Sequence, residues 1–364
     1  MRYTLAYYIT PHGFGHAVRS LEVIRQLMAS HENLDILVVS DLPQFLLDEN
    51  VGRPLSQRRK RVDVGLVQKD SLQFDLEATR TSLADLYGRR HSVVEEEIRF
   101  FREKGVHAIV CDIPFLPFEA AALYGIPALG MSNFTWDWIY QAYARWDARW
   151  NALVEWIRES YEKCGHFLQL PMHGDCSACP RRQDVPLVAR KVRRSRQETR
   201  RTLGCEADQK AYLIAFADLR LNDAAQRRLE AMSDTLFFYK KPLSFEFSNG
   251  RSLDAFSLPY TDVVAAMDGV ITKPGYGIVS DCLVAGAPMV YTDRGFFPEY
   301  EILVQEMNRH LSTVYLPSAD LYSGAWETAL KNLEALPVRH VRVDDAGAAV
   351  CAEVIWKALG GAHA

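Results

Sequence analysis

Two histidines in a short glycine-rich loop are the side chains best suited to proton transfer in this sequence. The run Pro11-His-Gly-Phe-Gly-His16 follows an apolar stretch, and His16 stands where a helix should begin. A neutral imidazole can act as a general base near neutral pH, and the positive end of a helix dipole favours the neutral form. Asp112 ends a later apolar stretch, and a carboxylate bound to one ring nitrogen fixes the tautomer and stabilises the charge formed on proton uptake. The same pattern is compatible with a plain helix cap and a plain strand-end cap.

A second glycine loop, much later in the chain, is a candidate phosphate site. An apolar pair leads into Lys273-Pro-Gly-Tyr-Gly277, a helix-like stretch spans residues 278–285, and a further apolar run follows. Gly275 and Gly277 allow a backbone to approach a ligand closely and permit positive φ. The free N–H groups at the start of a helix are a common way to hold phosphates. The segment therefore predicts either a diphosphate cradle or a tight turn that needs glycine for its geometry alone.

Polar and aromatic residues near these loops offer further binding groups. Arg294 and Glu299 follow the apolar run after the second glycine loop, where the arginine could reach a phosphate and the glutamate a sugar hydroxyl. Trp136 and Trp138 stand at the entry to a helix, where they could stack on a sugar ring. Alternatively, Arg294 and Glu299 lie in an ordinary surface loop, and the two tryptophans pack in the core.

Two other clusters are candidate sites. Cys176 and Cys179 have the spacing of a zinc knuckle, with Cys164, His166 and His173 nearby, but a second clean pair is missing, so an ordinary linker with thiols explains them as well. The basic run Arg190 to Arg201 is a candidate for peripheral contact with anionic lipid or phosphate, or a solvated helix face. No GxSxG motif indicates a serine nucleophile.

The composition is that of a globular protein without a nucleic-acid signature. The chain has 364 residues, 48% of them hydrophobic and 24% charged, and its net charge is -4. No apolar run reaches the ~20 residues of a membrane span, and no secretory leader is evident. The seven cysteines are scattered rather than spaced as a disulfide framework. We therefore expect a cytoplasmic protein in a reducing compartment.

Alternating strand and helix patterns predict two α/β domains of Rossmann type. In the first half the expected strands are 3–9, 34–40, 62–67, 107–112 and 128–132, and the expected helices are 17–30, 83–104, 117–124 and 138–164. In the second half the expected strands are 211–216, 235–240, 268–272, 289–291 and 313–316, and the expected helices are 221–232, 262–267, 278–285, 325–336 and 346–359. Ligands of open α/β sheets bind at the carboxyl ends of the strands, so two such domains facing across a cleft would place one glycine loop on each wall.

The domain boundaries follow from the break in this alternation. Residues 1–170 are expected to form the acceptor-side domain, and the Pro- and Gly-containing segment 171–186 the linker. Residues 187–345 are expected to form the nucleotide-sugar domain, and the last helix, in 346–364, to cross back to the first domain.

Several stretches of the chain resemble known families. Lys273-Pro-Gly-Tyr-Gly-Ile-Val-Ser-Asp281, followed by Ala285-Gly-Ala-Pro288, is similar to the nucleotide-sugar site of inverting GT-B glycosyltransferases, such as the lipid-II-forming N-acetylglucosaminyltransferase family. A closer resemblance, over nearly the whole chain, is to the glycosyltransferase-like N-terminal module of plant L-arabinokinases. It is carried by Ala6-Tyr-Tyr-Ile-Thr-Pro-His-Gly-Phe-Gly-His-Ala-Val-Arg19, Ser132-Asn-Phe-Thr-Trp-Asp-Trp-Ile-Tyr140 and Asp184-Val-Pro-Leu-Val-Ala-Arg190.

The resemblance implies roles for the matching residues, with His16 as acceptor base and Asp112 as its partner. The implied donor-binding residues are Lys273, Gly275, Tyr276, Gly277, Ser280, Asp281, Arg294 and Glu299. The implied acceptor-binding residues are His12, Gly13, Phe14, Gly15, Asn133, Trp136 and Asp137. Two positions depart from the pattern. Asp281 stands where the family has a ribose-binding glutamate, and Phe216-Ala217-Asp218 replaces a glycine pair.

Taken together, the residues and the resemblance predict an inverting, metal-independent, hexosyltransferase-like enzyme. It would move a sugar from a nucleoside diphosphate sugar, such as a UDP-sugar, to an acceptor hydroxyl, with no cofactor beyond that co-substrate and no nucleic-acid partner. Two alternatives stay open: an isomerase similar to nucleotide-sugar 2-epimerases, and a non-catalytic module that binds nucleotide sugars.

Overall fold

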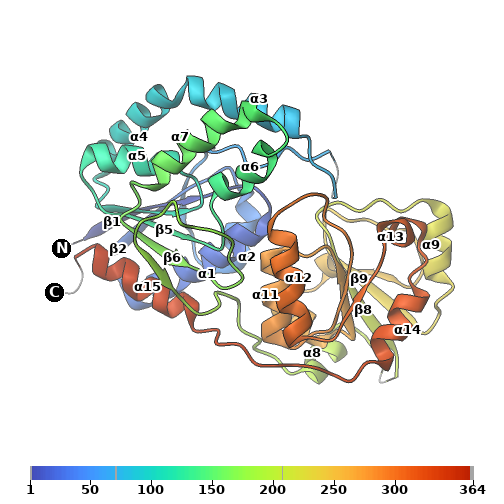
Figure 1. The fold of residues 1–364 in the computed structure, drawn as a ribbon. Coiled ribbons are helices and arrows are strands. Elements are labelled where there is room, and N and C mark those ends of the chain that lie inside the picture. The colour runs from blue at the N-terminus through green and yellow to red at the C-terminus, as the bar shows by residue number, and fades with distance from the viewer. Residues whose placement is uncertain (1, 70–71, 207, 361–364) are drawn as a thin grey trace. The chain divides into compact units, whose positions relative to one another are not determined.

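The computed structural model describes residues 2–69, 72–206 and 208–360, which form two compact units. Unit 1 comprises the chain up to Val67, Asp75–Ala189 and the chain from Asp344, and unit 2 comprises Gln68–Phe74 and Arg190–Val343. Each unit is a parallel sheet with helices packed against it (Figure 1). Among the described residues, no helix is long and apolar enough to cross a bilayer.

Unit 1 contains a seven-stranded sheet with the order β3-β2-β1-β4-β5-β6-β7, and every pairing in it is parallel. Its strands are β1 (Tyr3–Ile9), β2 (Leu34–Val39), β3 (Ser56–Arg58), β4 (Ala108–Asp112), β5 (Ala128–Ser132), β6 (His166–Gln169) and β7 (Arg182–Asp184). Its helices are α1 (Phe14–Ser30), α2 (Gln44–Val51), α3 (Leu76–Gly88), α4 (Arg90–Lys104), α5 (Leu116–Tyr124), α6 (Trp136–Ala144), η1 (Ala148–Trp150), α7 (Asn151–Tyr161) and α15 (Gly347–Ala358).

Unit 2 contains a six-stranded parallel sheet with the order β10-β9-β8-β11-β12-β13. Its strands are β8 (Lys210–Ala215), β9 (Thr235–Tyr239), β10 (Gly250–Ser252), β11 (Gly269–Thr272), β12 (Met289–Tyr291) and β13 (Thr313–Tyr315). Its helices are α8 (Arg196–Thr202), α9 (Asp223–Glu230), η2 (Leu253–Ala255), α10 (Tyr260–Ala266), α11 (Tyr276–Ala285), α12 (Glu299–His310), α13 (Ser318–Ser323) and α14 (Glu327–Ala335). The order reverses direction next to the first strand in both units, as in doubly wound folds. The α/β prediction is confirmed.

The central strands of both sheets are continuous apolar runs because they are covered on both faces. All five residues of β4 are buried, as are all four of β11. In unit 1, Ile9 is the register partner of Asp112, and the backbone N–H of Thr10 donates to the Asp112 carbonyl at 2.8 Å. In unit 2, Thr272 at the end of β11 pairs with Ala215 of β8. Each glycine loop therefore begins at the carboxyl edge of its own sheet.

The segment 171–186, expected to be a linker, belongs to unit 1 in the structure. Strand β7 lies inside this segment and pairs with β6, and Cys176 and Cys179 are buried. The segment lacks helical or strand periodicity, but the backbone N–H of Gly174 donates to the Asn133 carbonyl at 2.9 Å, so it is packed structure rather than a tether. The chain passes into unit 2 after Ala189 and returns at Asp344.

The last helix, α15, packs against α1 within unit 1. The Trp356 indole stacks on the His31 ring, with centroids 3.9 Å apart. At the start of the helix the backbone passes so close to Pro186 that a Cβ on Gly347 would lie 2.1 Å from its carbonyl oxygen. The Leu187 N–H donates to the Asp344 carbonyl at 2.9 Å. This hydrogen bond joins the segment that leaves unit 1 to the segment that returns to it.

Several predicted elements differ from the observed ones. Residues 62–67 are not a strand, and the third strand of unit 1 is β3 instead. Gly65 has a φ of 69°, which a regular strand does not allow. The predicted helices 83–104 and 138–164 are each interrupted, the first at Arg89 and the second between α6 and α7. Five further elements, which are short or lack a clear apolar period, were not predicted: α2, β6, β10, α12 and α13.

Candidate active site

His16 and Asp112 come together in unit 1 at the edge where β1 and β4 end. The Nδ1 atom of His16 lies 2.7 Å from Oδ1 of Asp112. His16 is 7% exposed, and Asp112 is completely buried. His16 is the third residue of α1, which begins after Gly13, a residue with a φ of 81° that favours glycine. The predicted pair is therefore within hydrogen-bond distance.

A buried arginine, which the sequence analysis did not single out, joins this pair. Arg19 lies one helical turn after His16 and is 2% exposed. Its Nε donates to Oδ2 of Asp112 at 2.7 Å, and its Nη2 donates to Oδ1 at 2.6 Å. The Ser20 hydroxyl donates to Oδ2 at 2.8 Å. The i, i+3 spacing between His16 and Arg19 could have indicated that the two side chains lie on one face of the helix. An arginine at such a position is usually exposed to solvent, however.

The hydrogen bonds from His16, Arg19 and Ser20 stabilise the negative charge of Asp112. Burial alone would raise the pKa of its carboxyl group, but the Arg19 guanidinium and the His16 ring outweigh burial and lower that pKa to about 2. The carboxylate is therefore ionised throughout the neutral range, and it accepts hydrogen bonds from three side chains of α1.

Hydrogen-bond accounting assigns the tautomer of His16. The Nη2 atom of Arg19 carries two hydrogens, and it donates to Asp112 Oδ1 at 2.6 Å and to the Ser132 hydroxyl at 2.8 Å. The same Nη2 lies 2.8 Å from His16 Nδ1, but no further hydrogen remains for that contact. Nδ1 therefore carries the ring proton and donates to Asp112, which leaves the lone pair on Nε2.

His12, the other loop histidine, does not join the pair. Its Nδ1 accepts a hydrogen bond from the Leu66 N–H at 3.3 Å, and its ring lies edge-on to Trp136 with centroids 5.4 Å apart. A Cβ on Gly65 would lie 2.8 Å from this Nδ1, so the loop around Gly65 closes directly over the ring. His12 therefore anchors the segment that follows β3.

Three residues predicted to bind the acceptor are buried instead. Asn133 and Trp136 have no exposed surface, and Asp137 is 4% exposed. Asn133 Oδ1 accepts from Arg19 Nη1 at 2.7 Å, and the Trp136 indole N–H donates to Asp63 at 3.2 Å. Trp136 cannot stack on a ligand because its ring is enclosed by the core. The prediction for Trp136 was wrong because aromatic residues at the start of a helix have the same sequence pattern whether they line a binding surface or pack in the core.

Phe14 is a predicted acceptor-side residue whose side chain is open to solvent. It is 41% exposed, and its ring meets that of Phe45, itself 45% exposed, edge-on with centroids 6.3 Å apart. Phe14 begins α1 and Phe45 lies on α2, so both follow strand ends of the same sheet. Phe45 was not identified from the sequence, because α2 was not predicted.

In unit 2 the second glycine loop leads directly into α11. Gly275 is the N-cap of this helix, with a φ of -142°, and the Val279 N–H donates to its carbonyl at 3.0 Å. Gly275 is thus extended rather than left-handed, and Gly277 lies inside the helix, so positive φ is not the reason for either glycine. A Cβ on Gly275 would meet nothing within 4 Å. The space in front of this helix start is open.

Arg294 and Glu299 lie together beside this loop. Arg294 Nη1 donates to the Pro274 carbonyl at 3.0 Å and to Glu299 Oε2 at 2.7 Å. Its Nε is buried and has no hydrogen-bond partner among the described residues. The Glu299 carboxylate is 2% exposed and takes the arginine as partner. Arg294 thus lies next to the loop, and the glutamate expected to bind a sugar is paired with it.

Asp281 is also engaged within unit 2. Arg190 Nη2 donates to its Oδ2 at 2.5 Å, and the guanidinium carbon of Arg190 lies 5.2 Å from the centre of the Tyr260 ring. Asp281 is 3% exposed. The departure from the family pattern at this position therefore coincides with a buried ion pair. The neighbouring Ser280 hydroxyl is buried without a hydrogen-bond partner in the described part of the chain.

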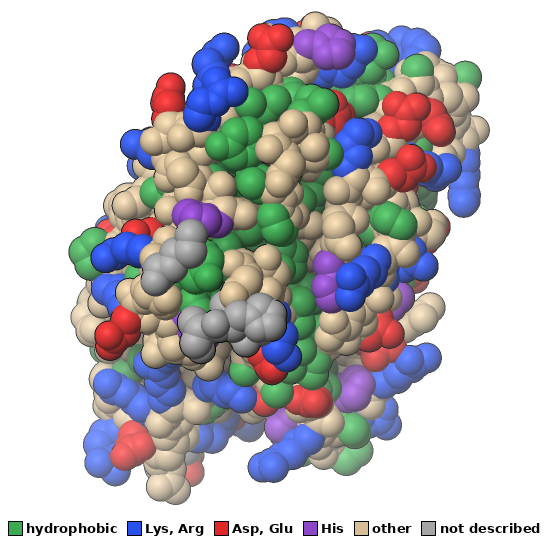
Figure 2. Space-filling model, turned by 90° about the vertical axis from the view of Figure 1, so that its left-hand side faces the viewer, with side chains coloured by type: hydrophobic (Ala, Val, Ile, Leu, Met, Phe, Trp, Pro, Cys, Tyr) green, Lys and Arg blue, Asp and Glu red, His purple; other side chains and the backbone are tan. Residues whose placement is uncertain are grey.

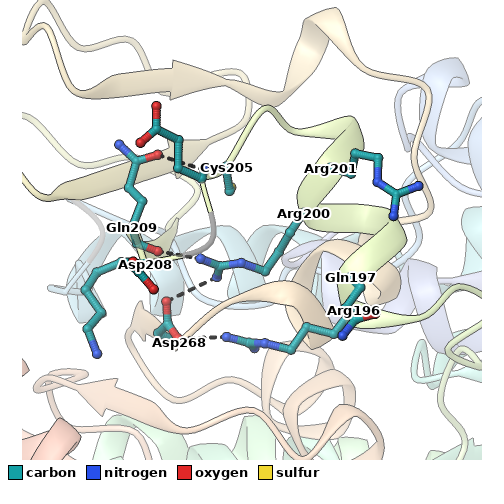
Figure 3. Close-up of a pocket in the computed structure, with 10 residues that line it drawn as sticks. Arg196, Gln197, Arg200, Arg201, Cys205, Asp208, Gln209 and Asp268 are labelled. Carbon is teal, nitrogen blue, oxygen red and sulfur yellow. Dashed lines mark hydrogen bonds and ion pairs between the residues drawn. The ribbon is translucent and has the colours of Figure 1, made fainter.

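Three arginines of the basic run, Arg190, Arg196 and Arg200, are bound to the protein itself, whereas Arg193, Arg194 and Arg201 are exposed. Residues 190–195 are not helical, and α8 begins at Arg196. Arg196 and Arg200 bind the Asp268 carboxylate at 2.7 and 3.2 Å, at a surface cavity of about 730 Å³ drawn in Figure 3. They also donate to the carbonyls of Met267 and Ala266, which α10 leaves without helical partners at its end. On the face drawn in Figure 2, basic and acidic side chains are interspersed.

The cysteines expected as a metal candidate are buried thiols. Burial raises the pKa of Cys176 and Cys179, and the neighbouring Cys164 thiol raises the pKa of Cys179 further. Within residues 2–69, 72–206 and 208–360, no group of three or more potential ligands is arranged to hold a metal ion.

Solved glycosyltransferases have the same architecture as this chain. The glycotransferase of kitacinnamycin is 16% identical, with a TM-score of 0.65 over 99% of this chain and 100% of that one. Arabidopsis thaliana UGT89C1 is 14% identical over 100% of this chain and 98% of its own, with TM-scores of 0.61 for its complex with quercetin and 0.59 for that with UDP-L-rhamnose. The chain has the GT-B fold. The two sheets, with their six and seven parallel strands, are the two halves of this GT-B chain.

One curated protein resembles the GT-B chain in sequence. L-arabinokinase of Arabidopsis thaliana is 30% identical over 340 residues, which are 91% of this chain and 32% of the arabinokinase. The GT-B chain thus spans about a third of that relative's length. No model of a known protein family matches it. The resemblance to the lipid-II-forming family stays a prediction.

Proposed function

We propose that this chain is an inverting glycosyltransferase that uses a nucleoside diphosphate sugar. The observation that carries the proposal is the His16–Asp112 contact of 2.7 Å at the carboxyl edge of the sheet. Because Nδ1 donates to Asp112, Nε2 is the atom that would accept the proton of an acceptor hydroxyl. The acceptor oxygen would then attack the anomeric carbon as the bond from that carbon to the diphosphate oxygen breaks. Attack opposite the leaving group inverts the anomeric configuration.

The loop before α11 is the proposed diphosphate site. The N–H groups at the start of the ten-residue helix point their dipoles toward an anion, and Arg294 stands beside Pro274 in the same loop. These groups would take up the charge that develops on the leaving diphosphate, so the proposed reaction needs no metal ion. Lys273, Tyr276 and Gly277 stay proposed contacts of the donor.

Similarity to known proteins supports this proposal at the level of fold and substrate class. The UGT89C1 structures hold UDP-L-rhamnose or quercetin, a nucleotide sugar and a hydroxylated aromatic compound. Exposed Phe14 and Phe45 offer an apolar contact for an acceptor on the same sheet edge as His16. All seven cysteines are unpaired, which supports a cytoplasmic location. A membrane contact through residues 190–201 has less support, because Arg190, Arg196 and Arg200 bind acidic side chains.

Binding and turnover of nucleotide sugars test the proposal. The thermal unfolding of the protein is measured with UDP, GDP and ADP and with their sugars, and a ligand at 100 times its Kd adds about 2.7 kcal/mol of stability. We expect at least one diphosphate to raise the Tm, and release of that diphosphate from its sugar when an acceptor is supplied. Absence of any Tm change would contradict the donor site. Turnover that persists in His16→Ala would contradict the mechanism.

A binding module without catalysis is the second candidate, and the Arg190–Asp281 pair favours it. The Asp281 carboxylate is paired with Arg190 and is 3% exposed, which would weaken a standard contact with a ribose hydroxyl. The isomerase alternative has less support, since Asp112, Asp281 and Glu299 are each bound to an arginine rather than open to a sugar. Diphosphate binding without turnover for any acceptor would favour the module, and an epimer formed without acceptor would favour the isomerase.

A further inference from the structure

We propose that Arg19 is a positioning residue, which holds Asp112, fixes the proton of His16 on Nδ1 and offsets the charge of the carboxylate. This inference deepens the proposed function and rests on it for its catalytic meaning. It makes the site an ionic triad of histidine, aspartate and arginine, rather than a histidine–aspartate pair.

The guanidinium group of Arg19 binds the Asp112 carboxylate and the residues at the end of β5 at the same time. Nε and Nη2 bind the two carboxylate oxygens of Asp112 at 2.7 and 2.6 Å, the bidentate arrangement that only arginine provides. Nη1 and Nη2 also donate to Asn133 and Ser132 at 2.7 and 2.8 Å. One side chain of α1 thereby binds the ends of β4 and β5. The Asp112 carboxylate cannot rotate away from His16 while both of its oxygens are held.

The second effect of Arg19 is electrostatic. A carboxylate alone behind an imidazole would stabilise the imidazolium form by its full negative charge. Here Asp112 and Arg19 together are neutral, and Arg19 Nη2 lies 2.8 Å from the ring nitrogen. A proton taken up at Nε2 therefore creates a cation next to a cation. The Arg19 charge therefore opposes part of the stabilisation that Asp112 alone would give to a protonated ring.

The other ionisable groups near the triad do not supply the positive charge that Arg19 contributes. Burial raises the pKa of the Tyr7 hydroxyl on β1, and burial raises the pKa of the Cys351 thiol on α15 to about 12, so both are neutral at pH 7. Asp63, in the segment after β3, is the further carboxyl group that interacts with His16. Burial raises the pKa of Asp63, while Thr10 and Trp136 donate hydrogen bonds that oppose the rise. Arg19 is thus the cation in direct contact with the ring.

The tautomer and titration of His16 can be measured without any enzymatic assay. Protein labelled with ¹⁵N-histidine gives long-range proton–nitrogen correlations that distinguish an Nδ1–H ring from an Nε2–H ring and from imidazolium, and His16→Gln identifies the signal. We expect the Nδ1–H form in the unsubstituted protein. An Nε2–H ring would overturn the proposal.

Two variants with opposite electrostatic effects separate charge from loosened packing. Arg19→Gln leaves the Asp112 carboxylate without its counter-charge, so the imidazolium signals should appear at higher pH than in the unsubstituted protein. Asp112→Asn leaves Arg19 without its counter-charge, so these signals should appear only at lower pH. Far-UV circular dichroism shows whether each variant is folded. Shifts of the same sign, or no shift in Arg19→Gln, would overturn the proposal.

A third variant keeps the charge and removes the fork. Arg19→Lys cannot bind both carboxylate oxygens in one plane, so we expect a mixture of the two neutral tautomers with a midpoint near that of the unsubstituted protein. It also covers the case in which Arg19→Gln does not fold. A single Nδ1–H form in Arg19→Lys would contradict the positioning role. If the transferase activity is established, kcat should fall in Arg19→Lys with KM nearly unchanged. If no transferase activity exists, the tautomer results still decide the role of Arg19.

Discussion

Ile9 and Asp112 are register partners at the ends of two parallel strands, β1 and β4. This pairing sets the loop that follows Ile9 beside the Asp112 carboxylate, although about a hundred residues separate them in the chain. The imidazole of His16 reaches the carboxylate because α1 begins within that loop. The pair is therefore a product of the sheet order, and its chemistry can be tested residue by residue.

Loss of the His16 ring should abolish most of the proposed transfer. A positioned general base contributes about 10²–10⁴-fold to the rate, so His16→Ala should lower kcat by that range while diphosphate binding in unit 2 is retained. Steady-state kinetics and calorimetry with the diphosphate measure the two quantities. His31→Ala is the matched control, because His31 stacks on Trp356 away from the triad. Equal losses in both variants would contradict a specific role for His16.

The stability contributed by Asp112 should depend on pH. The pKa of Asp112 is lowered from 3.8 to about 2 in the folded protein, so folding binds fewer protons and the contribution is fully present above pH 4. It should disappear as the pH falls from about 4 to about 2, and it is on the order of 2 kcal/mol. Urea unfolding of the unsubstituted protein and of Asp112→Asn should therefore show a difference that shrinks in acid.

At neutral pH the same Asp112→Asn substitution should destabilise unit 1. It leaves the Arg19 guanidinium buried without its counter-charge, a situation that costs about 3–5 kcal/mol. A free energy of unfolding that is unchanged at pH 7, with no pH-dependent difference from the unsubstituted protein, would show that the ion pair is not formed in solution.

The open space in front of Gly275 predicts a binding defect without a folding defect. A Cβ at this position meets no atom of the protein within 4 Å, so Gly275→Ala should change the free energy of unfolding by less than about 0.5 kcal/mol. The methyl group would enter the space of a bound diphosphate, and the Kd for UDP, or for the diphosphate that binds best, should rise about tenfold.

Gly286→Ala is the control for this substitution at the other end of α11. Gly286 has a φ of 67°, and a Cβ there would lie 2.5 Å from the His340 ring, so the variant should lose about 1–3 kcal/mol of stability with unchanged affinity for the diphosphate. Tight diphosphate binding by Gly275→Ala would count against the cradle.

The Arg190–Asp281 pair should behave as a coupled structural unit. Removal of Arg190 leaves Asp281 as a buried charge, so Arg190→Met should destabilise unit 2 by about 3–5 kcal/mol. Asp281→Asn leaves the partly exposed Arg190 without its partner and should cost less. The double variant should be less destabilised than the sum, by a coupling energy of about 0.5–3 kcal/mol. Denaturant unfolding of the four proteins measures the cycle. Additive effects would mean that Asp281 is free to bind a ligand instead.

The periodicities of the sequence were sufficient for much of the fold. The strands at residues 3–9, 128–132 and 289–291 were predicted with their observed bounds, because buried strands of a parallel sheet are continuous apolar runs. The edge strands β3 and β10 were not found, since their residues are polar or glycine and form no apolar run. The segment 171–186 looked like a linker for the same reason, although contacts with the rest of unit 1 hold it in place.

The sequence by itself determined the α/β class, the two glycine loops and the choice of His16 and Asp112 as a chemical pair. Those conclusions depend on residue type and local spacing, which one chain displays directly. The tertiary structure alone decided that Arg19 neutralises Asp112, that Arg190 holds Asp281, and that Trp136 is core. Burial and pairing between residues far apart in the chain depend on which strands become neighbours. No local pattern distinguishes an arginine on a solvent face from one that closes an ionic triad.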